Sequence, residues 1–158
     1  MKFLLILFVA VFINVNLNAQ NKSAVNTNQP KMEMKLNAGF ITNKLDETKK
    51  FYSEVLNFGV SFENEFYLLL HTPNNEAEIS FLLPNHPSQQ ALFQPEFAGK
   101  GAYLTIEVAE VDSFYEKLKK LKVPIKIDLR DEPWGDRHFA IEDPNGIGID
   151  IVTYAPKQ

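Results

Sequence analysis

The feature that most constrains the fold is an internal duplication. Between residues 35 and 154, one predicted strand, one amphipathic helix and three further predicted strands follow one another, and the same order then repeats. Each helix carries a Phe-Tyr pair near the same place, Phe51-Tyr52 and Phe114-Tyr115, with an aspartate near the helix start. A repeated order of elements predicts two copies of one supersecondary unit that pack together. The alternative is two independent amphipathic helices of similar composition.

Apolar periodicity and turn-forming residues give the expected elements. We expect the first module at residues 35–84, a linker rich in proline and glutamine at 85–100, and the second module at 101–154. Asp46 or Asn43 is the expected cap of the first helix. The expected helices cover residues 45–56 and 111–122, and the expected strands cover 35–42, 59–64, 66–72, 78–84, 102–109, 125–130, 137–142 and 147–154.

The N-terminus predicts export. Lys2 precedes an apolar run over residues 3–15, and the pattern is that of a secretory signal over residues 1–19, cleaved after Ala19. A retained N-terminal anchor is the alternative, but the run is shorter than the roughly 20 residues that a bilayer core requires. Residues 20–34 are polar and predict a flexible tether. The expected location is the periplasm or the exterior, with no stable membrane insertion after the signal is removed.

Composition excludes several classes of function. The chain has 16 Lys and Arg against 20 Asp and Glu, a formal net charge of -4, and no basic patch that suits a nucleic acid. It contains no cysteine, which excludes disulfide frameworks, thiol catalysis and zinc-thiolate sites. Stability must therefore come from packing, and one domain of about 120 residues is large enough for a single core.

The most specific local pattern is the run from Glu132 to Ile151. Asp143-Pro144-Asn145-Gly146 predicts a type I turn in which Asp143 bonds back to the backbone and Gly146 takes a positive φ. Such a turn sets the register of the hairpin, with these expected pairs: Asp143 with Ile147, Glu142 with Gly148, Ile141 with Ile149, Ala140 with Asp150, Phe139 with Ile151, and His138 with Val152.

Period-two alternation then separates the hairpin into two faces. The apolar face is expected to pack on the helices, whereas the second face is polar, with small residues at Ala140 and Gly148. On that face His138 and Asp150 lie diagonally, within reach of each other or of one ligand. A glycine within a strand often marks the close approach of a ligand or another backbone. The alternative is an ordinary solvent-facing sheet.

Two segments carry a family resemblance. LDETKKFYSEVLNFGV (45–60) and WGDRHFAIEDPNGIGIDIV (134–152), with the two-module order, resemble the vicinal oxygen chelate (VOC) superfamily of glyoxalase I, extradiol dioxygenases and bleomycin-resistance proteins. The resemblance covers nearly all of residues 35–154. It implies an α+β fold, the glyoxalase/bleomycin resistance/dihydroxybiphenyl dioxygenase fold, in which two βαβββ modules form a cup-shaped mixed sheet with helices outside. It also implies a homodimer, in some members with exchanged modules.

The resemblance also identifies the positions that hold a metal in metal-dependent members. Those members place His, Glu or Gln at four inward positions, which fall here on Asn37, Glu78, Tyr103 and Asp150. An imidazole-carboxylate site for Zn, Fe or Ni requires two or more nitrogen ligands, and neither histidine position is kept. We therefore expect no cofactor and no tightly held metal. The candidates for a weakly bound divalent ion are Glu78 and Asp150, with His138 as a substitute ligand.

The expected function is the binding of a small organic molecule in the cup by an exported protein of the glyoxalase/bleomycin-resistance type. Members of the bleomycin-resistance type lack the metal and carry a Trp-Gly segment before the turn, as Trp134-Gly135 does here. The candidate ligand contacts are Asn37, Tyr67, Tyr103, Trp134, Arg137 and His138.

Several alternatives remain open at the level of sequence. Glu78 and Asp150 are candidate catalytic residues, as a general base and its partner in a metal-free isomerase. They are also candidate metal ligands, with His138, in a metal-dependent lyase, isomerase or dioxygenase with a rearranged metal site. A third alternative is an interaction module whose sheet serves only a dimer. Trp134 either stacks on a flat ligand or closes the end of the core, Arg137 either anchors an anion or forms a surface ion pair, and the two tyrosines either line the cavity or cover the core.

Overall fold

The computed structural model describes residues 34–156. The expected signal at 1–19, and the expected tether except for its last residue, lie outside the described residues. Among residues 34–156, no helix combines the length and the apolar character that a membrane-spanning segment requires.

The duplicated order of elements is confirmed. Every expected helix and strand is present, and the ends differ from the expected ones by no more than three residues. The first module contains β1 (Ala38–Ile41), α1 (Leu45–Glu54), β2 (Gly59–Glu63), β3 (Tyr67–His71) and β4 (Glu78–Leu82). A short helix, η1 (Ala91–Phe93), lies in the linker. The second module contains β5 (Tyr103–Glu107), α2 (Val111–Lys120), β6 (Ile127–Asp131), β7 (Arg137–Glu142) and β8 (Gly148–Thr153).

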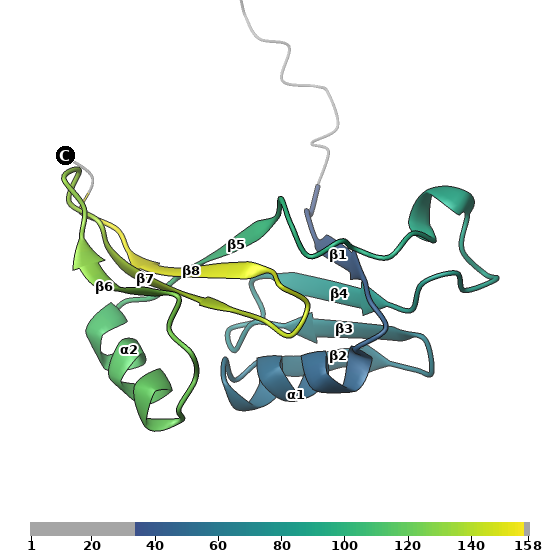
Figure 1. Cartoon of the computed structure of the whole chain (residues 1–158), viewed down its shortest axis with the longest axis horizontal. Helices are drawn as coiled ribbons and strands as arrows, with labels where there is room; N and C mark the ends of the chain where they lie inside the picture. The colour runs from purple at the N-terminus through teal and green to yellow at the C-terminus, as the bar shows by residue number, and fades with distance from the viewer. Residues whose placement is uncertain (1–33, 157–158) are drawn as a thin grey trace, which may run out of the picture. The chain divides into compact units, whose positions relative to one another are not determined.

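Each module forms its own four-stranded mixed sheet. The strand orders are β1-β4-β3-β2 and β5-β8-β7-β6, and the first strand of each module runs parallel to its last strand (Figure 1). Because the two orders are identical, the modules are structural repeats. Within the described residues the strands form two separate sheets and no closed barrel.

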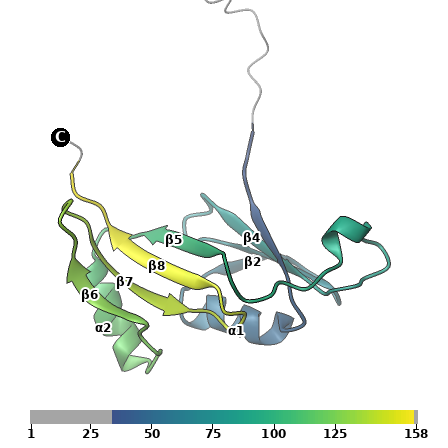
Figure 2. The ribbon, with the colours of Figure 1, turned by 45° about the horizontal axis from the view of Figure 1, so that its top comes forward.

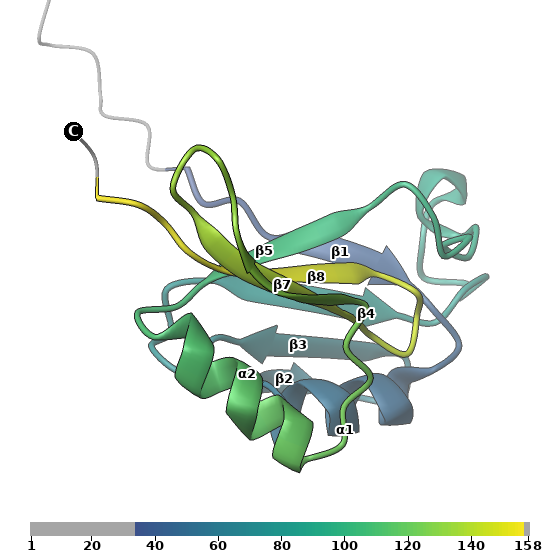
Figure 3. The same ribbon diagram turned by 60° about the vertical axis from the view of Figure 1, so that its left-hand side comes forward.

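The helices cover one face of each sheet. Helix α1 packs on β3, and α2 packs on β7 and β8. Figure 2 shows β5, β8, β7 and β6 side by side in one layer with α2 on its far side. Both helices lie on the same side of the two sheets (Figures 1 and 3), so the opposite face of each sheet carries no helix of this domain.

The β7–β8 hairpin has the expected register. The predicted pairs from Glu142 with Gly148 to His138 with Val152 are present, and the Asp143 N–H donates to the Ile147 carbonyl at 3.0 Å, as expected for the first pair. Gly146 has a φ of 82°, and the Asp143 carboxylate accepts the backbone N–H groups of Asn145 and Ile147 at 2.8 and 2.9 Å. The alternation places one apolar set against the helices, where Phe139, Ile141, Ile149 and Ile151 are at most 1% exposed.

The expected cap of α1 is wrong. The residue before the helix is Lys44, whose backbone N–H donates to Thr42 Oγ1 at 3.1 Å. Asn43 lies one residue too early to cap, and Asp46 lies inside the first turn. There its negative charge still favours the helix N-terminus, where partial positive charge accumulates.

The turn at residues 143–146 also joins the two modules. Thr42 Oγ1 donates to Asn145 Oδ1 at 2.7 Å, and Asn145 Nδ2 donates to Thr48 Oγ1 at 3.0 Å. The Tyr52 hydroxyl donates to Asp143 Oδ2 at 3.3 Å. Burial, followed by the charge of Asp143, raises the pKa of Tyr52. We call this set of hydrogen bonds, made by Thr42, Thr48, Tyr52, Asp143 and Asn145, the module joint.

Candidate ligand-binding site

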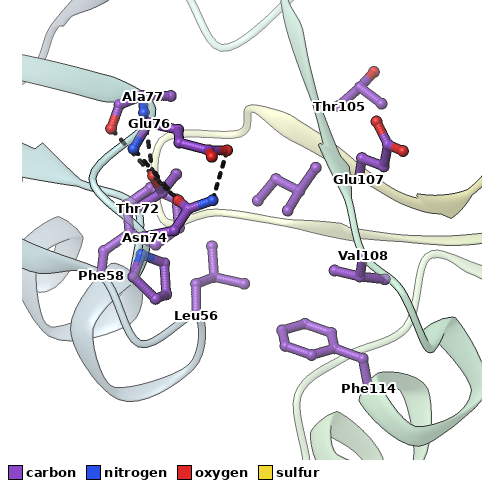
Figure 4. Close-up of a pocket in the computed structure, with 12 residues that line it drawn as sticks. Leu56, Phe58, Thr72, Asn74, Glu76, Ala77, Thr105, Glu107, Val108 and Phe114 are labelled. Atoms are coloured by element: carbon purple, nitrogen blue, oxygen red, sulfur yellow. Dashed lines mark hydrogen bonds between the residues drawn. The ribbon is translucent and has the colours of Figure 1, made fainter.

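A hollow of about 450 Å³ lies between the two modules (Figure 4). The first module contributes the residues that follow α1 and the connection between β3 and β4, and the second contributes β5 and the start of α2. Its lining is mainly apolar, with oxygen-bearing side chains among the rest. The residues that line it are Leu56, Phe58, Thr72, Pro73, Asn74, Glu76, Ala77, Thr105, Ile106, Glu107, Val108 and Phe114.

A smaller hollow of about 120 Å³ adjoins the first one. The two share Phe58, Thr72, Ala77, Thr105 and Ile106. The smaller hollow extends to Glu78, so one of the four expected metal positions lies at this cavity. Two larger depressions, of about 550 and 660 Å³, are each lined by one module and mainly by polar and charged side chains. The intermodule hollow is therefore the better candidate for an organic ligand, because such sites are mostly apolar.

The connection between β3 and β4 is held by its own hydrogen bonds. The Thr72 N–H donates to the Ala77 carbonyl at 3.0 Å, and Asn75 takes a positive φ of 59°. The Thr72 hydroxyl donates to Asn74 Oδ1 at 2.7 Å, and Asn74 Nδ2 donates to Glu76 Oε2 at 2.7 Å. Figure 4 shows this chain of bonds on one wall of the hollow, opposite β5. The wall is thus ordered without help from a ligand.

Glu78 belongs to a polar cluster on the helix-free face of the first sheet. Its carboxylate accepts from Lys35 Nζ at 2.8 Å, Ser61 Oγ at 3.1 Å and Asn37 Nδ2 at 3.4 Å. The hydrogen bond from Lys35, followed by that from Ser61, lowers the pKa of Glu78. The structure therefore brings together two of the expected site residues, Asn37 and Glu78, and adds a lysine that the sequence did not indicate.

Asp150 belongs to a second cluster, on the helix-free face of the second sheet. Its Oδ1 lies 2.6 Å from His138 Nδ1, and Glu132 Oε1 lies 2.9 Å from His138 Nε2. Arg130 also donates to Glu132, with Nε at 2.7 Å. A neutral imidazole has one N–H, so two carboxylate partners favour the charged ring. The hydrogen bond to Asp150 is the main cause that raises the pKa of His138.

Glu78 and Asp150, the two carboxylates among the expected metal positions, belong to separate hydrogen-bonded clusters. Asp150 is hydrogen-bonded to His138 in one sheet, and Glu78 is paired with Lys35 in the other. Tyr103 is 75% exposed, pairs with Gly148, and forms no hydrogen bond with either carboxylate among the described residues. Within residues 34–156, no three or more His, Asp or Glu side chains are grouped so that they could hold a metal ion.

The remaining expected contacts lie away from the hollow. Trp134 is 68% exposed, and its Nε1 donates to Asp136 at 2.8 Å, so it does not close the core. Arg137 lies on the helix side of β7, where Nε and Nη2 both donate to Asp112 at 2.9 Å and Nη1 donates to Asp131 at 2.8 Å. These two carboxylates raise the pKa of Arg137. Tyr67 lies beside Phe62, with ring centres 6.2 Å apart.

The expected close approach at Gly148 is not found within the described residues. A Cβ atom at this position would meet only the Cβ of Tyr103, at 3.8 Å, which is an ordinary van der Waals distance. The structure therefore gives no steric reason for glycine here.

None of the twelve residues that line the hollow was among the site residues expected from the sequence. Leu56, Phe58 and Phe114 follow the apolar pattern of core residues, and nothing in their spacing distinguishes them from the rest of the core. The one available signal is the pair of carboxylates, with Glu76 shortly before β4 and Glu107 at the end of β5, close to apolar residues of these strands.

The His138 cluster predicts a pH dependence of stability. The pKa of His138 in the folded protein lies above the ordinary value of about 6.5. The stabilisation that the protonated ring gains from Asp150 and Glu132 is therefore complete below about pH 6.5 and is lost as the pH rises through the folded-state pKa. We expect the melting temperature of His138→Gln to depend less on pH than that of the wild type across this window. Thermal unfolding from about pH 5 to about pH 9 measures the difference.

His86→Gln is the matched control, because the His86 ring stacks on Phe66 and contacts Ser88 rather than carboxylates. Equal pH profiles for the wild type and His138→Gln would contradict the prediction.

Comparison with known proteins identifies a family with this architecture. A family model described as "Glyoxalase/Bleomycin resistance protein/Dioxygenase superfamily" matches residues 36–151. A search of curated proteins finds no match.

Solved structures with the same fold are similar over most of the domain. A bleomycin-binding protein complexed with bleomycin shares 19% identity at a TM-score of 0.57, covering 78% of this chain and 100% of its own. A glyoxalase/bleomycin resistance protein/dioxygenase from Nocardioides shares 16% identity at a TM-score of 0.65, and the match covers 82% of this chain and 91% of that protein. Lactoylglutathione lyase from Agrobacterium tumefaciens shares 16% identity at a TM-score of 0.61, and the match covers 78% of this chain and 96% of that protein.

At these identities the structural likeness shows the fold alone, whereas the family model spans both modules and the linker. The chain therefore belongs to the glyoxalase/bleomycin resistance protein/dioxygenase superfamily, the VOC superfamily, as its repeated modules and its DPNG hairpin had indicated.

Proposed function

We propose that this protein binds a small organic molecule in the hollow between its two modules, without a tightly held metal. The observation that carries the proposal is the hollow itself. Its volume of about 450 Å³ falls within the roughly 300–1,000 Å³ of small-molecule sites. Leu56, Phe58 and Phe114 give it apolar walls, and Thr105 and Glu107 add a few polar groups, which is the usual composition of such a site.

The positions of the carboxylates favour binding over catalysis. A lyase, isomerase or dioxygenase of the alternative kind would use Glu78, Asp150 and His138 around one substrate. Glu78 is held by Lys35 in the first sheet, whereas Asp150 is held by His138 in the second. Stoichiometric Zn, Ni, Mn or Fe in protein purified without a histidine tag would contradict this part of the proposal.

The proposal includes export and self-association. The N-terminal pattern of residues 1–19 supports export to the periplasm or the exterior. The helix-free faces carry exposed aromatic and aliphatic side chains, including Phe62 at 52% and Tyr103 at 75%, and these support a homodimer. A monomer in analytical ultracentrifugation at micromolar concentration would contradict the dimer.

The experiment that tests the binding site uses a neutral aromatic probe, 1-naphthylmethanol, and isothermal titration calorimetry. We expect Phe114→Ala to weaken binding about fivefold to tenfold, because the variant loses about 1–1.5 kcal/mol of apolar contact with the probe. Leu92→Ala is the matched control, since Leu92 is 79% exposed in the linker and does not line the hollow. Thermal melts of both variants show whether they remain folded.

The proposed site would be wrong if the folded Phe114→Ala variant bound the probe as tightly as the wild type does. Absence of measurable binding to the wild type would also count against it.

A further inference from the structure

We infer that the ligand of the intermodule hollow is cationic, with an apolar body that carries a primary amine or a guanidinium group. This inference rests on the proposed binding function and adds the chemical class of the ligand.

The charged side chains that line the hollow are both negative. Glu76 comes from the connection between β3 and β4, and Glu107 comes from the end of β5. Figure 4 shows them on opposite walls, with Glu76 extending toward the space between. Of the twelve lining residues, none is a lysine, an arginine or a histidine. A charged group that enters this hollow therefore meets carboxylates on two sides.

The hydrogen bonds within the wall use up donors and leave acceptors. The Thr72 hydroxyl proton is given to Asn74, and one N–H of the Asn74 amide is given to Glu76 Oε2. Glu76 Oε1 has no partner among the described residues, and neither does either carboxylate oxygen of Glu107. Carboxylates only accept hydrogen bonds when ionised, so the remaining capacity suits a ligand that donates.

The polar and apolar groups lie in separate parts of the hollow. In Figure 4 the oxygen atoms of Glu76, Thr105 and Glu107 lie toward one end, and the side chains of Leu56, Val108 and Phe114 lie toward the other. A molecule that fills both ends must have a polar donor group at one end and a hydrocarbon body at the other. This division distinguishes a cationic amphipathic ligand from a small inorganic cation, which would not use the apolar end.

Lys117 of the second module lies beside Phe114 and forms no ion pair with Glu76 or Glu107. Lys117 Nζ lies 5.2 Å from the centre of the Phe114 ring and 3.5 Å from the Val55 carbonyl, so it is turned toward the backbone after α1. It is not among the residues that line the hollow.

The effect of each carboxylate is modest because both are exposed. An exposed ion pair changes an equilibrium by at most about fivefold, and salt screens it. Charge therefore determines which apolar ligand is preferred, and the apolar walls supply most of the affinity.

The test compares three probes that share one naphthalene body: 1-naphthylmethylamine, 1-naphthylmethanol and 1-naphthoate. Calorimetry at pH 7 and low salt is expected to give the tightest binding for the amine and the weakest for the carboxylate, with about fivefold between successive probes. About 0.5 M NaCl should bring the three dissociation constants together, because charge is then screened within a few ångströms.

A double variant identifies the source of the preference. Glu76→Gln combined with Glu107→Gln is expected to remove the difference between the dissociation constants of the amine and the alcohol. Glu96→Gln, an exposed linker residue outside the hollow, is the matched control and should keep the full preference.

The outcomes separate the two proposals. Equal binding of all three probes by the wild type would overturn the inference and leave the proposed binding function standing. A preference for the amine that survives in the double variant would also overturn the inference, because its source would lie elsewhere. Failure of all three probes to bind would overturn the proposed function, and the inference with it.

Discussion

Replacing Asp143 by alanine is expected to lower the free energy of unfolding by about 2–4 kcal/mol. The Asp143 side chain belongs to a residue that is 4% exposed, and it accepts the backbone N–H groups of Asn145 and Ile147 at 2.8 and 2.9 Å. It also accepts from Tyr52 and from Asn145 Nδ2. Alanine would leave these donors without their acceptor in a place that water scarcely reaches. Urea unfolding followed by circular dichroism measures the loss.

Asp143→Asn is the matched control, because its amide oxygen keeps one acceptor in the same position. We expect it to lose less stability than Asp143→Ala. A loss below about 0.5 kcal/mol for the alanine variant, the range of ordinary surface substitutions, would show that the module joint contributes little to stability.

The second large effect is expected at Tyr52. Its side chain is fully buried and contacts Phe51, Phe58 and Phe81, with ring centres 5.2–5.6 Å apart. Tyr52→Ala would leave a cavity between α1 and the first sheet, which typically costs about 3–5 kcal/mol. Tyr52→Phe keeps the ring and removes only the hydrogen bond to Asp143, so we expect it to cost about 1 kcal/mol. Denaturant unfolding of both variants measures these losses.

The internal repeat supplies the control. Tyr115 occupies the equivalent place in α2, but it is only half-buried, packs on Phe139 at 5.2 Å, and donates its hydroxyl to the exposed Asp128. Tyr115→Ala should therefore cost clearly less than Tyr52→Ala. Equal losses at the two positions would contradict the view that Tyr52 has a special role at the module joint.

Tyr52 and Asp143 should also be energetically coupled. The hydroxyl of one is bonded to the carboxylate of the other, and residues in one hydrogen-bond network are seldom additive. The coupling joins a helix of the first module to a turn of the second. These two roles account for the unusual composition of the DPNG turn, which closes a hairpin and also connects the two repeats.

Local chemistry was sufficient to predict the repeated βαβββ order and the register of the last hairpin. The turn type follows from Pro144 and Gly146, and a shift of one residue would have exposed Phe139 and Ile141 and buried Asp150. The hydrogen bond between His138 and Asp150 followed from that register. These features depend on interactions between residues that are close together in the chain, so they can be predicted from the sequence.

Contacts between distant segments depended on tertiary structure. Lys35 pairs with Glu78, which lies 43 residues later in the chain, and Thr42 donates to Asn145, which lies 103 residues later. Arg137 forms an ion pair with Asp112 on α2. The hollow arises where β5 and α2 of one module meet the β3–β4 connection of the other.

The sequence alone determined the two modules, their strands and the apolar face of each, because hydrophobic period and turn residues act locally. Only the tertiary structure decided which polar side chains meet and where the hollow lies, because the placement of one module against the other depends on contacts that no local period encodes.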